Sequence, residues 1–135
     1  MAEPAREAAS MPLLLDTHVF LWWRANEPRL GAGARHAIAS APLVYVSAAS
    51  AWEASIKVGL GRLRLPESFE TGVRESGFEQ LPMVFRHAER AGGLAGHHRD
   101  PFDRMLVAQA LEESLVLVTA DRQLFPYEVP VLWAD

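Results

Sequence analysis

The sequence predicts an α/β fold, a three-layer α/β/α sandwich around a mostly parallel central sheet. Short apolar segments with the length of buried strands alternate along the chain with longer segments of helical periodicity. Strands that alternate with helices form βαβ units, so the pattern predicts parallel strands covered by helices on both faces. The 135 residues, half of them hydrophobic, suffice for one domain with a substantial core.

The predicted strands are short segments rich in apolar and β-branched residues: 13–15, 43–46, 79–81, 115–119 and 131–133. The predicted helices lie between them: 19–26, around 32–40, a helix carrying residues 52–57, 66–76, 86–91 and 105–113, with a short helical turn after residue 121. Pro28 interrupts the first helix, and Ser47 or Ser50 can cap the helix over 52–57. Asp100 and Pro101 have the residue types of an N-cap and a first helical position.

The composition and the charge exclude several classes of protein. Cysteine is absent, which excludes a disulfide scaffold, zinc–thiolate sites and thiol nucleophiles. The formal charge is −4, so any contact with nucleic acid must come from a local basic patch. No apolar run reaches the roughly 20 residues of a membrane helix. These features predict a soluble, cytoplasmic protein with no membrane partner, and we expect residues 1–11 to be a flexible extension before a domain over 12–135.

Acidic residues follow two of the predicted strands. Asp16 comes directly after the first strand, and Asp121 lies two residues after the strand over 115–119. If these strands are neighbours, both acids face one crevice at the carboxyl ends of the sheet. Glu53 lies early on a helix that follows a strand, and Asp103 lies in the first turn of another helix, so both can reach the same edge. Clustered carboxylates repel one another and are tolerated mainly around a hard cation, so the sequence predicts a Mg²⁺ or Mn²⁺ site.

Each of these acids also has a purely structural interpretation. Asp121 can cap the turn that follows it, and Asp103 can offset the dipole of its helix. Glu53 can pair with Lys57, one helical turn away. Asp16 is least easily explained in this way, because a carboxylate that closes a Leu-Leu-Leu strand is close to buried and buried acids need a partner.

Four segments together resemble the PIN-domain ribonucleases, specifically the toxins of VapBC toxin–antitoxin pairs. They are Leu-Leu-Leu-Asp16-Thr17-His18, Ser50-Ala51-Trp52-Glu53-Ala54-Ser55-Ile56-Lys57, His98-Arg99-Asp100-Pro101-Phe102-Asp103-Arg104 and Leu117-Val118-Thr119-Ala120-Asp121. Each motif alone is weakly specific, whereas the four in this order and spacing are a strong signal that covers essentially residues 12–133. The resemblance implies a PIN-like three-layer fold and a Mg²⁺- or Mn²⁺-dependent endoribonuclease, a hydrolase of RNA phosphodiester bonds.

The resemblance also implies roles for individual residues and for partners. By motif position, the catalytic and metal-binding acids are Asp16, Glu53, Asp103 and Asp121, with Thr119 as the hydroxyl residue just ahead of the last acid. Asp100 is an additional acid, which either supports the metal ligands or serves only as the N-cap of its helix. The family implies an RNA substrate, here expected to be tRNA or rRNA, a homodimer, and inhibition by a small VapB-like antitoxin.

Local basic residues are expected to hold the RNA. Arginines and histidines cluster between residues 86 and 104, and we expect Arg99 or Arg104, which adjoin the acids, to contact the scissile region. A second basic stretch is formed by Lys57, Arg62 and Arg64.

Two further points stay open at the level of sequence. Burial is more typical than base stacking for Trp22 and Trp23, and an exposed apolar groove near them would suit an antitoxin helix or strand, or a dimer mate.

The functional alternative is a PIN-like fold that binds RNA or a partner without catalysis. A receiver domain is disfavoured because Lys57 is the sole lysine and does not end a late strand, and the stretch Asp16-Thr17-His18 lacks the second acid of haloacid-dehalogenase-type phosphatases.

Overall fold

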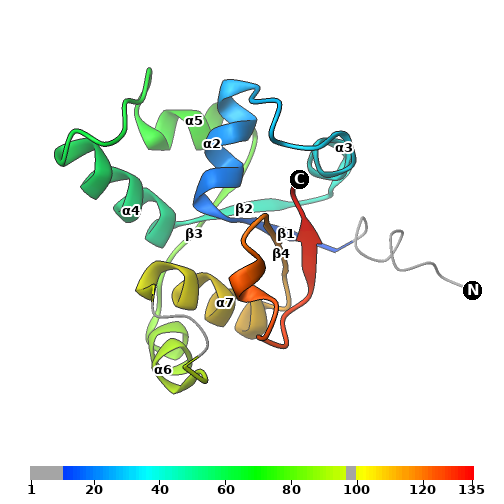
Figure 1. Ribbon diagram of the computed structural model, residues 1–135, viewed down its shortest axis with the longest axis vertical. Coiled ribbons are helices and arrows are strands. Elements are labelled where there is room, and N and C mark those ends of the chain that lie inside the picture. The colour runs from blue at the N-terminus through cyan, green and yellow to red at the C-terminus, as the bar shows by residue number, and fades with distance from the viewer. Residues whose placement is uncertain (1–10, 97–99) are drawn as a thin grey trace, which may run out of the picture.

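The structure, a computed structural model, describes residues 11–96 and 100–135 (Figure 1). Its centre is a five-stranded sheet with the order β3-β2-β1-β4-β5, in which all neighbouring strands pair in parallel. The strands are β1 (Leu13–Leu15), β2 (Val44–Ser47), β3 (Glu79–Leu81), β4 (Val116–Thr119) and β5 (Val131–Trp133). All five lie at segments that the sequence predicts as strands, and their common direction confirms the parallel sheet.

Helices cover both faces of this sheet (Figure 1). They are α2 (Thr17–Ala25), α3 (Ala32–Ser40), α4 (Ala48–Gly59), α5 (Phe69–Glu75), α6 (Phe85–Gly93), α7 (Pro101–Glu113) and the 3₁₀ helix η1 (Arg122–Leu124). In Figure 1, α2, α3 and α5 lie on one side of the sheet and α6 and α7 on the other, which confirms the three-layer sandwich. α4 contacts α2 and α5 in one layer and α7 in the other, so it joins the two layers.

Side-chain caps explain where the helix boundaries differ from the predicted ones. α2 begins two residues before its predicted start, because the Asp16 carboxylate accepts a hydrogen bond from the N–H of His18. α5 begins three residues after its predicted start, because the Ser68 hydroxyl accepts from the N–H of Thr71. Of the two serines predicted as possible caps of α4, Ser47 is the one whose hydroxyl accepts from a backbone N–H.

Alternate residues of the central strands face opposite helix layers. Leu13 and Leu15 of β1 belong to a buried cluster with residues of α2, α3 and α5, whereas Leu14 belongs to a second cluster with residues of α7. β4 repeats the pattern, with Val116 and Val118 in the first cluster and the residue between them in the second. Because both faces of the strands are buried, their sequences are continuous apolar runs.

The order of the strands reverses at β1. The chain continues from β1 to β2 and β3 on one side and then returns to place β4 on the other side of β1. β1 and β4 pair directly, with Leu15 opposite Val118, so their carboxyl ends lie side by side. This pairing confirms the condition under which Asp16 and Asp121 share one crevice, since ligand sites of open parallel sheets lie at such a reversal.

Residues 1–10, which the sequence predicts as most of a flexible extension, lie outside the described residues. Met11, the last residue of that predicted extension, is half-buried and packs against the first core cluster. No helix within the described part of the chain is both long enough and apolar enough to cross a membrane.

Arg104 of α7 binds the end of α6 and the two residues that follow it. Its guanidinium donates hydrogen bonds to the carbonyl oxygens of Ala91, Leu94 and Ala95, at 2.9, 2.8 and 3.0 Å. The last carbonyl oxygens of a helix have no partner within the helix, and here a charged donor from the neighbouring helix supplies one. Arg104 therefore closes the C-terminal end of α6 and ties it to α7.

We expect the substitution Arg104→Met to lower the free energy of unfolding by about 1–3 kcal/mol, because three carbonyl oxygens lose a charged donor. Urea denaturation followed by circular dichroism measures this change. The control is Arg90→Met, since Arg90 forms a partly exposed ion pair with Glu112, whose loss is expected to cost less than about 1 kcal/mol. Equal stabilities of the two variants would contradict this role of Arg104.

Candidate active site

Asp16 stands where β1 passes into α2, at the reversal of strand order. Its backbone N–H continues the sheet by donating to the carbonyl oxygen of Val118 (2.9 Å). Its carboxylate accepts from the N–H of His18 through Oδ1 (3.2 Å) and from the hydroxyl of Thr119 through Oδ2 (2.7 Å). Only 5% of the residue is exposed, as expected for an acid that closes an apolar strand.

Burial raises the pKa of the Asp16 carboxyl above its ordinary value of 3.8, because a buried site disfavours the charged form. The hydrogen bond from Thr119 and the charge of His18 lower this pKa, whereas the negative charge of Glu53 raises it further. The net shift is upward. The hydrogen-bond partners of the carboxylate are a hydroxyl and a backbone amide, and neither carries a charge that neutralises it.

Thr119 connects Asp16 with Asp121. Its hydroxyl donates to Asp16 and accepts from the backbone N–H of Asp121 (3.0 Å). The Asp121 carboxylate also accepts from the N–H of Gln123 (2.9 Å), so Asp121 caps the turn that follows it. Asp16 and Asp121 nevertheless line one hollow of about 310 Å³, so the capping role and the shared crevice coexist.

Glu53 approaches Asp16 from α4. It is buried, with 8% of the residue exposed, and its charge acts on Asp16. Nζ of Lys57 lies 3.1 Å from Oε2 of Glu53, so the ion pair between successive helical turns is present. The hydroxyl of Thr17 donates to that of Ser50 in a buried hydrogen bond of 2.8 Å, which fixes the first turn of α2 against the first turn of α4. This contact keeps Glu53 near Asp16.

Thr17 and Ser50 are positioning residues that the sequence alone did not indicate. The available signal was a hydroxyl residue directly after one candidate acid and another three residues before the next candidate acid. The two residues are 33 positions apart, so only the packing of α2 against α4 reveals that they form a pair.

Asp100 and Asp103 lie at the start of α7. The Asp100 carboxylate accepts from the N–H groups of Phe102 (2.8 Å) and Asp103 (3.4 Å), which confirms its interpretation as an N-cap. The rings of Phe102 and Trp52 meet with their centroids 5.1 Å apart. The start of α7, with the half-buried Asp103, therefore lies against the part of α4 that carries Glu53.

Asp16, Asp121 and Glu53 form an acidic centre at the carboxyl ends of β1 and β4. Its chemistry fits a hard divalent cation. Carboxylate and hydroxyl oxygens are the ligands that Mg²⁺ and Mn²⁺ prefer, and burial leaves the charge of Asp16 in need of a counter-ion. Within residues 11–96 and 100–135, however, no three Asp, Glu or His side chains are close enough together to hold one ion in the positions that they occupy. The four-acid metal site stays a prediction.

The structure describes one of the two arginines that are predicted to contact RNA. Arg99 lies outside the described residues. Arg104 is half-buried, and its guanidinium binds the carbonyl oxygens at the end of α6. The structure thus gives Arg104 a structural role that the sequence did not indicate, and its contact with RNA stays a prediction.

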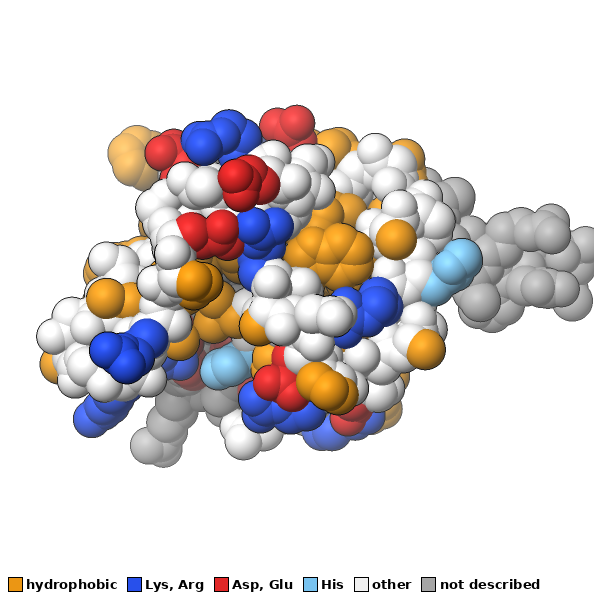
Figure 2. Space-filling model, turned by 90° about the horizontal axis from the view of Figure 1, so that it is seen from above, with side chains coloured by type: hydrophobic (Ala, Val, Ile, Leu, Met, Phe, Trp, Pro, Cys, Tyr) orange, Lys and Arg blue, Asp and Glu red, His pale blue; other side chains and the backbone are white. Residues whose placement is uncertain are grey.

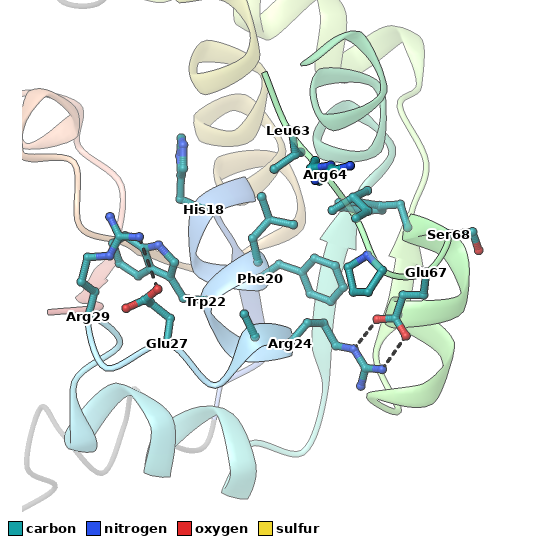
Figure 3. A pocket seen from close by; sticks show the side chains of 16 residues that line it. His18, Phe20, Trp22, Arg24, Glu27, Arg29, Leu63, Arg64, Glu67 and Ser68 are labelled. Carbon is teal, nitrogen blue, oxygen red and sulfur yellow. Dashed lines mark hydrogen bonds and ion pairs between the residues drawn. The ribbon is translucent and has the colours of Figure 1, made fainter. Parts of the chain in front are cut away.

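An apolar groove of about 300 Å³ adjoins the acidic centre (Figure 3). It lies between α2, α5 and the loop that joins α4 to α5, and its apolar lining includes Phe20, Leu21, Trp22, Leu63, Leu65 and Phe69. Arg24 closes one side through a two-point ion pair with Glu67, with nitrogen–oxygen distances of 2.8 and 2.9 Å. Figure 2 shows this face of the molecule, where apolar side chains are exposed between charged side chains of both signs.

The groove is continuous with the hollow that holds Asp16 and Asp121. His18 and Trp22 line both of them. Trp22 is half-buried, and the guanidinium of Arg29 lies 5.2 Å from the centroid of its ring. A segment bound in the groove would therefore end beside the acids.

Comparisons with known proteins agree on one family. The model of the PIN domain matches residues 13–128. Ribonuclease VapC22 of Mycobacterium tuberculosis (strain ATCC 25618 / H37Rv) is 35% identical to this chain over 126 residues, which cover 87% of this chain and 93% of that protein.

Solved structures share the fold. DNA-bound VapBC from Salmonella typhimurium matches with a TM-score of 0.67 at 19% identity, over 93% of this chain and 99% of that chain. VapBC2 from Rickettsia felis, bound to a DNA fragment from its promoter, matches with a TM-score of 0.66 at 14% identity, over 93% of this chain and 100% of that chain. At these identities the likeness concerns the fold alone.

The raised pKa of Asp16 predicts how the stability of the metal-free protein depends on pH. Because this pKa is higher in the folded chain than in the unfolded chain, the folded protein takes up the proton first as the pH falls. The ionised carboxylate therefore lowers the free energy of unfolding by its full amount above the raised pKa. This effect disappears below the ordinary pKa of 3.8.

We expect Asp16→Asn to remove this contribution, since asparagine is uncharged and an equally good N-cap. In metal-free buffer, the free energy of unfolding of the variant relative to that of wild type is expected to be highest near neutral pH and to decrease as the pH falls through the raised pKa. Urea denaturation at a series of pH values measures this difference. Asp100→Asn controls for the same substitution at another helix N-cap, and a difference for Asp16→Asn that is independent of pH would contradict a raised pKa.

Proposed function

The chain belongs to the PIN domain family, and on that premise we propose that it is an endoribonuclease that acts as the toxin of a VapBC-type toxin–antitoxin pair. The observation that carries the proposal is the buried carboxylate of Asp16, held by Thr119 at the reversal of strand order and acted on by the charge of Glu53. The relative at 35% identity is named a ribonuclease, and the structural neighbours are VapBC complexes.

We infer that Mg²⁺ or Mn²⁺ binds at the acidic centre, with Asp16, Glu53, Asp103 and Asp121 as its ligands. Such an ion supplies an activated water and stabilises the charge that develops on a phosphodiester. Thr119 orients the Asp16 carboxylate by donating to Oδ2. Lys57 compensates the charge of Glu53 in the metal-free protein, which limits the repulsion between Glu53 and Asp16.

The buried acid favours catalysis over the alternative of a PIN-like module that only binds RNA or a partner. Ionised Asp16 destabilises the fold and repels phosphate, so a surface that only binds RNA gains nothing from it. A metal-dependent hydrolase, in contrast, needs a carboxylate ligand at this place.

We further propose that a VapB-like antitoxin binds in the apolar groove between α2 and α5. A groove of this composition suits the apolar face of a helix or of an extended segment. Because His18 and Trp22 line both the groove and the hollow of the acids, a segment bound there can cover the acidic centre. A homodimer, a cytoplasmic location and tRNA or rRNA as the substrate remain predictions.

We expect Asp16→Asn to abolish Mn²⁺-dependent cleavage of RNA while the circular dichroism spectrum stays that of wild type, because asparagine keeps the volume but removes the charge of one ligand. Mn²⁺ at a hundredfold excess over Kd is expected to stabilise wild type by about 2.7 kcal/mol and the variant by much less. Gel analysis of RNA and thermal melts with and without Mn²⁺ measure these effects. Asp135→Asn, at an exposed ion pair with Arg122, is the control and should resemble wild type. Undiminished cleavage by Asp16→Asn refutes the proposed site.

For the antitoxin, we expect Leu63→Glu to weaken binding at least tenfold, about 1.4 kcal/mol, because it puts a charge at the apolar groove. Calorimetry with the VapB-like antitoxin that we propose as the partner measures the affinity. Leu60→Glu is the control, since Leu60 belongs to the same loop but is 61% exposed and does not line the groove. Equal affinities of the two variants would count against the groove as the binding site.

A further inference from the structure

Most arginines in the described residues are engaged within the fold. Those that bind a carboxylate or a backbone carbonyl oxygen are Arg24, Arg29, Arg35, Arg86, Arg90, Arg104 and Arg122. Within the same part of the chain, Arg62, Arg64 and Arg74 have neither kind of partner and are exposed. An exposed guanidinium that the fold does not use is available to an anionic ligand.

Arg62 and Arg64 lie on the irregular segment over 62–65 that follows α4. Both are exposed, whereas Leu63 and Leu65 are half-buried and line the apolar groove. Arg62 lies at a bend and residues 63–65 have no regular secondary structure, so the exposed arginines simply alternate with the half-buried leucines along this segment. The leucines line the groove, whereas the side chains of Arg62 and Arg64 are exposed on the same segment.

The segment follows the helix that carries Glu53 and lines the groove next to the hollow of Asp16 and Asp121. The backbone N–H of Arg62 donates to the carbonyl oxygen of Lys57 (2.8 Å), and Lys57 in turn binds Glu53. Arg64 lies at the edge of the groove that His18 also lines, and His18 follows Asp16 by two residues (Figure 3). Arg64 thus lies on the groove that continues to the hollow of the acids, and Arg62 lies just beyond the end of the helix that carries Glu53.

We propose that Arg62 and Arg64 bind the phosphodiester backbone of single-stranded RNA and guide it to the acidic centre; this inference rests on the proposed ribonuclease function. The chain has a formal charge of −4, so RNA must be attracted by local cations. Arginine suits this task because its planar guanidinium binds two phosphate oxygens at once. Contacts of this kind position the RNA without reading its sequence.

The test measures the affinity for a fluorescein-labelled single-stranded RNA of mixed sequence, about 20 nucleotides long, at a series of KCl concentrations. All proteins carry Asp16→Asn, so that the RNA is bound but not cleaved. With Arg62→Gln and Arg64→Gln combined, we expect the slope of log K against log salt concentration to become shallower by about 1.4, because each phosphate contact on a single strand contributes about 0.7. The matched control is Arg74→Gln, which removes an exposed, unengaged arginine from α5 and is expected to leave the slope unchanged.

A slope for the double substitution equal to that for Arg74→Gln would overturn the inference, even if wild type cleaves RNA. The inference also fails if the double substitution weakens binding of the antitoxin or of polyglutamate but not of RNA, because the arginines then recognise an acidic polypeptide. If wild type neither binds nor cleaves RNA, the proposed function fails and this inference fails with it. Circular dichroism melts check that these exposed substitutions leave the fold intact.

Discussion

The parallel pairing of β1 with β4 is the contact on which both the core and the acidic centre depend. It places Leu15 opposite Val118 in the middle of the sheet, so that alternate residues of the two strands reach the two helix layers. The same register brings the Thr119 hydroxyl to the Asp16 carboxylate across 103 positions of sequence. A slip of one residue would turn Thr119 to the opposite face of the sheet and remove this hydrogen bond. One alignment of two strands therefore sets both the packing and the site.

This alignment also buries a carboxylate, which lowers the stability of the metal-free protein. The hydroxyl of Thr119 and the charge of His18 offset the effect only in part, and the charge of Glu53 adds to it. Lys57 forms an ion pair with Glu53, and within the part of the chain that the structure describes no ion pair joins it to Asp16. A buried charge that lowers the stability of the fold is typical of functional sites, where such a group is kept because catalysis or binding needs it.

The short segment over 62–65 has two faces with different chemistry. Its leucines line the groove that we assign to the antitoxin, and its arginines, of which Arg64 also borders that groove, are the residues that we assign to RNA. Because both sets of residues come from one segment, these two assignments would place partner and substrate on adjacent surfaces of the protein. Toxin inhibition and substrate binding would then depend on the position of a single loop.

The sequence by itself determined most of the elements, the buried acid at the end of the first strand, and the caps of α7 and of the turn after Asp121. These features depend on apolar runs and caps, which are local signals that act within about one helical turn. Only the tertiary structure decided that Thr17 pairs with Ser50 and that Arg104 binds the end of α6. It also decided that, within residues 11–96 and 100–135, Arg62 and Arg64 bind no carboxylate or carbonyl oxygen. Such pairings join residues far apart along the chain, and they exist only after the sheet register and the packing of the helices have brought those residues together.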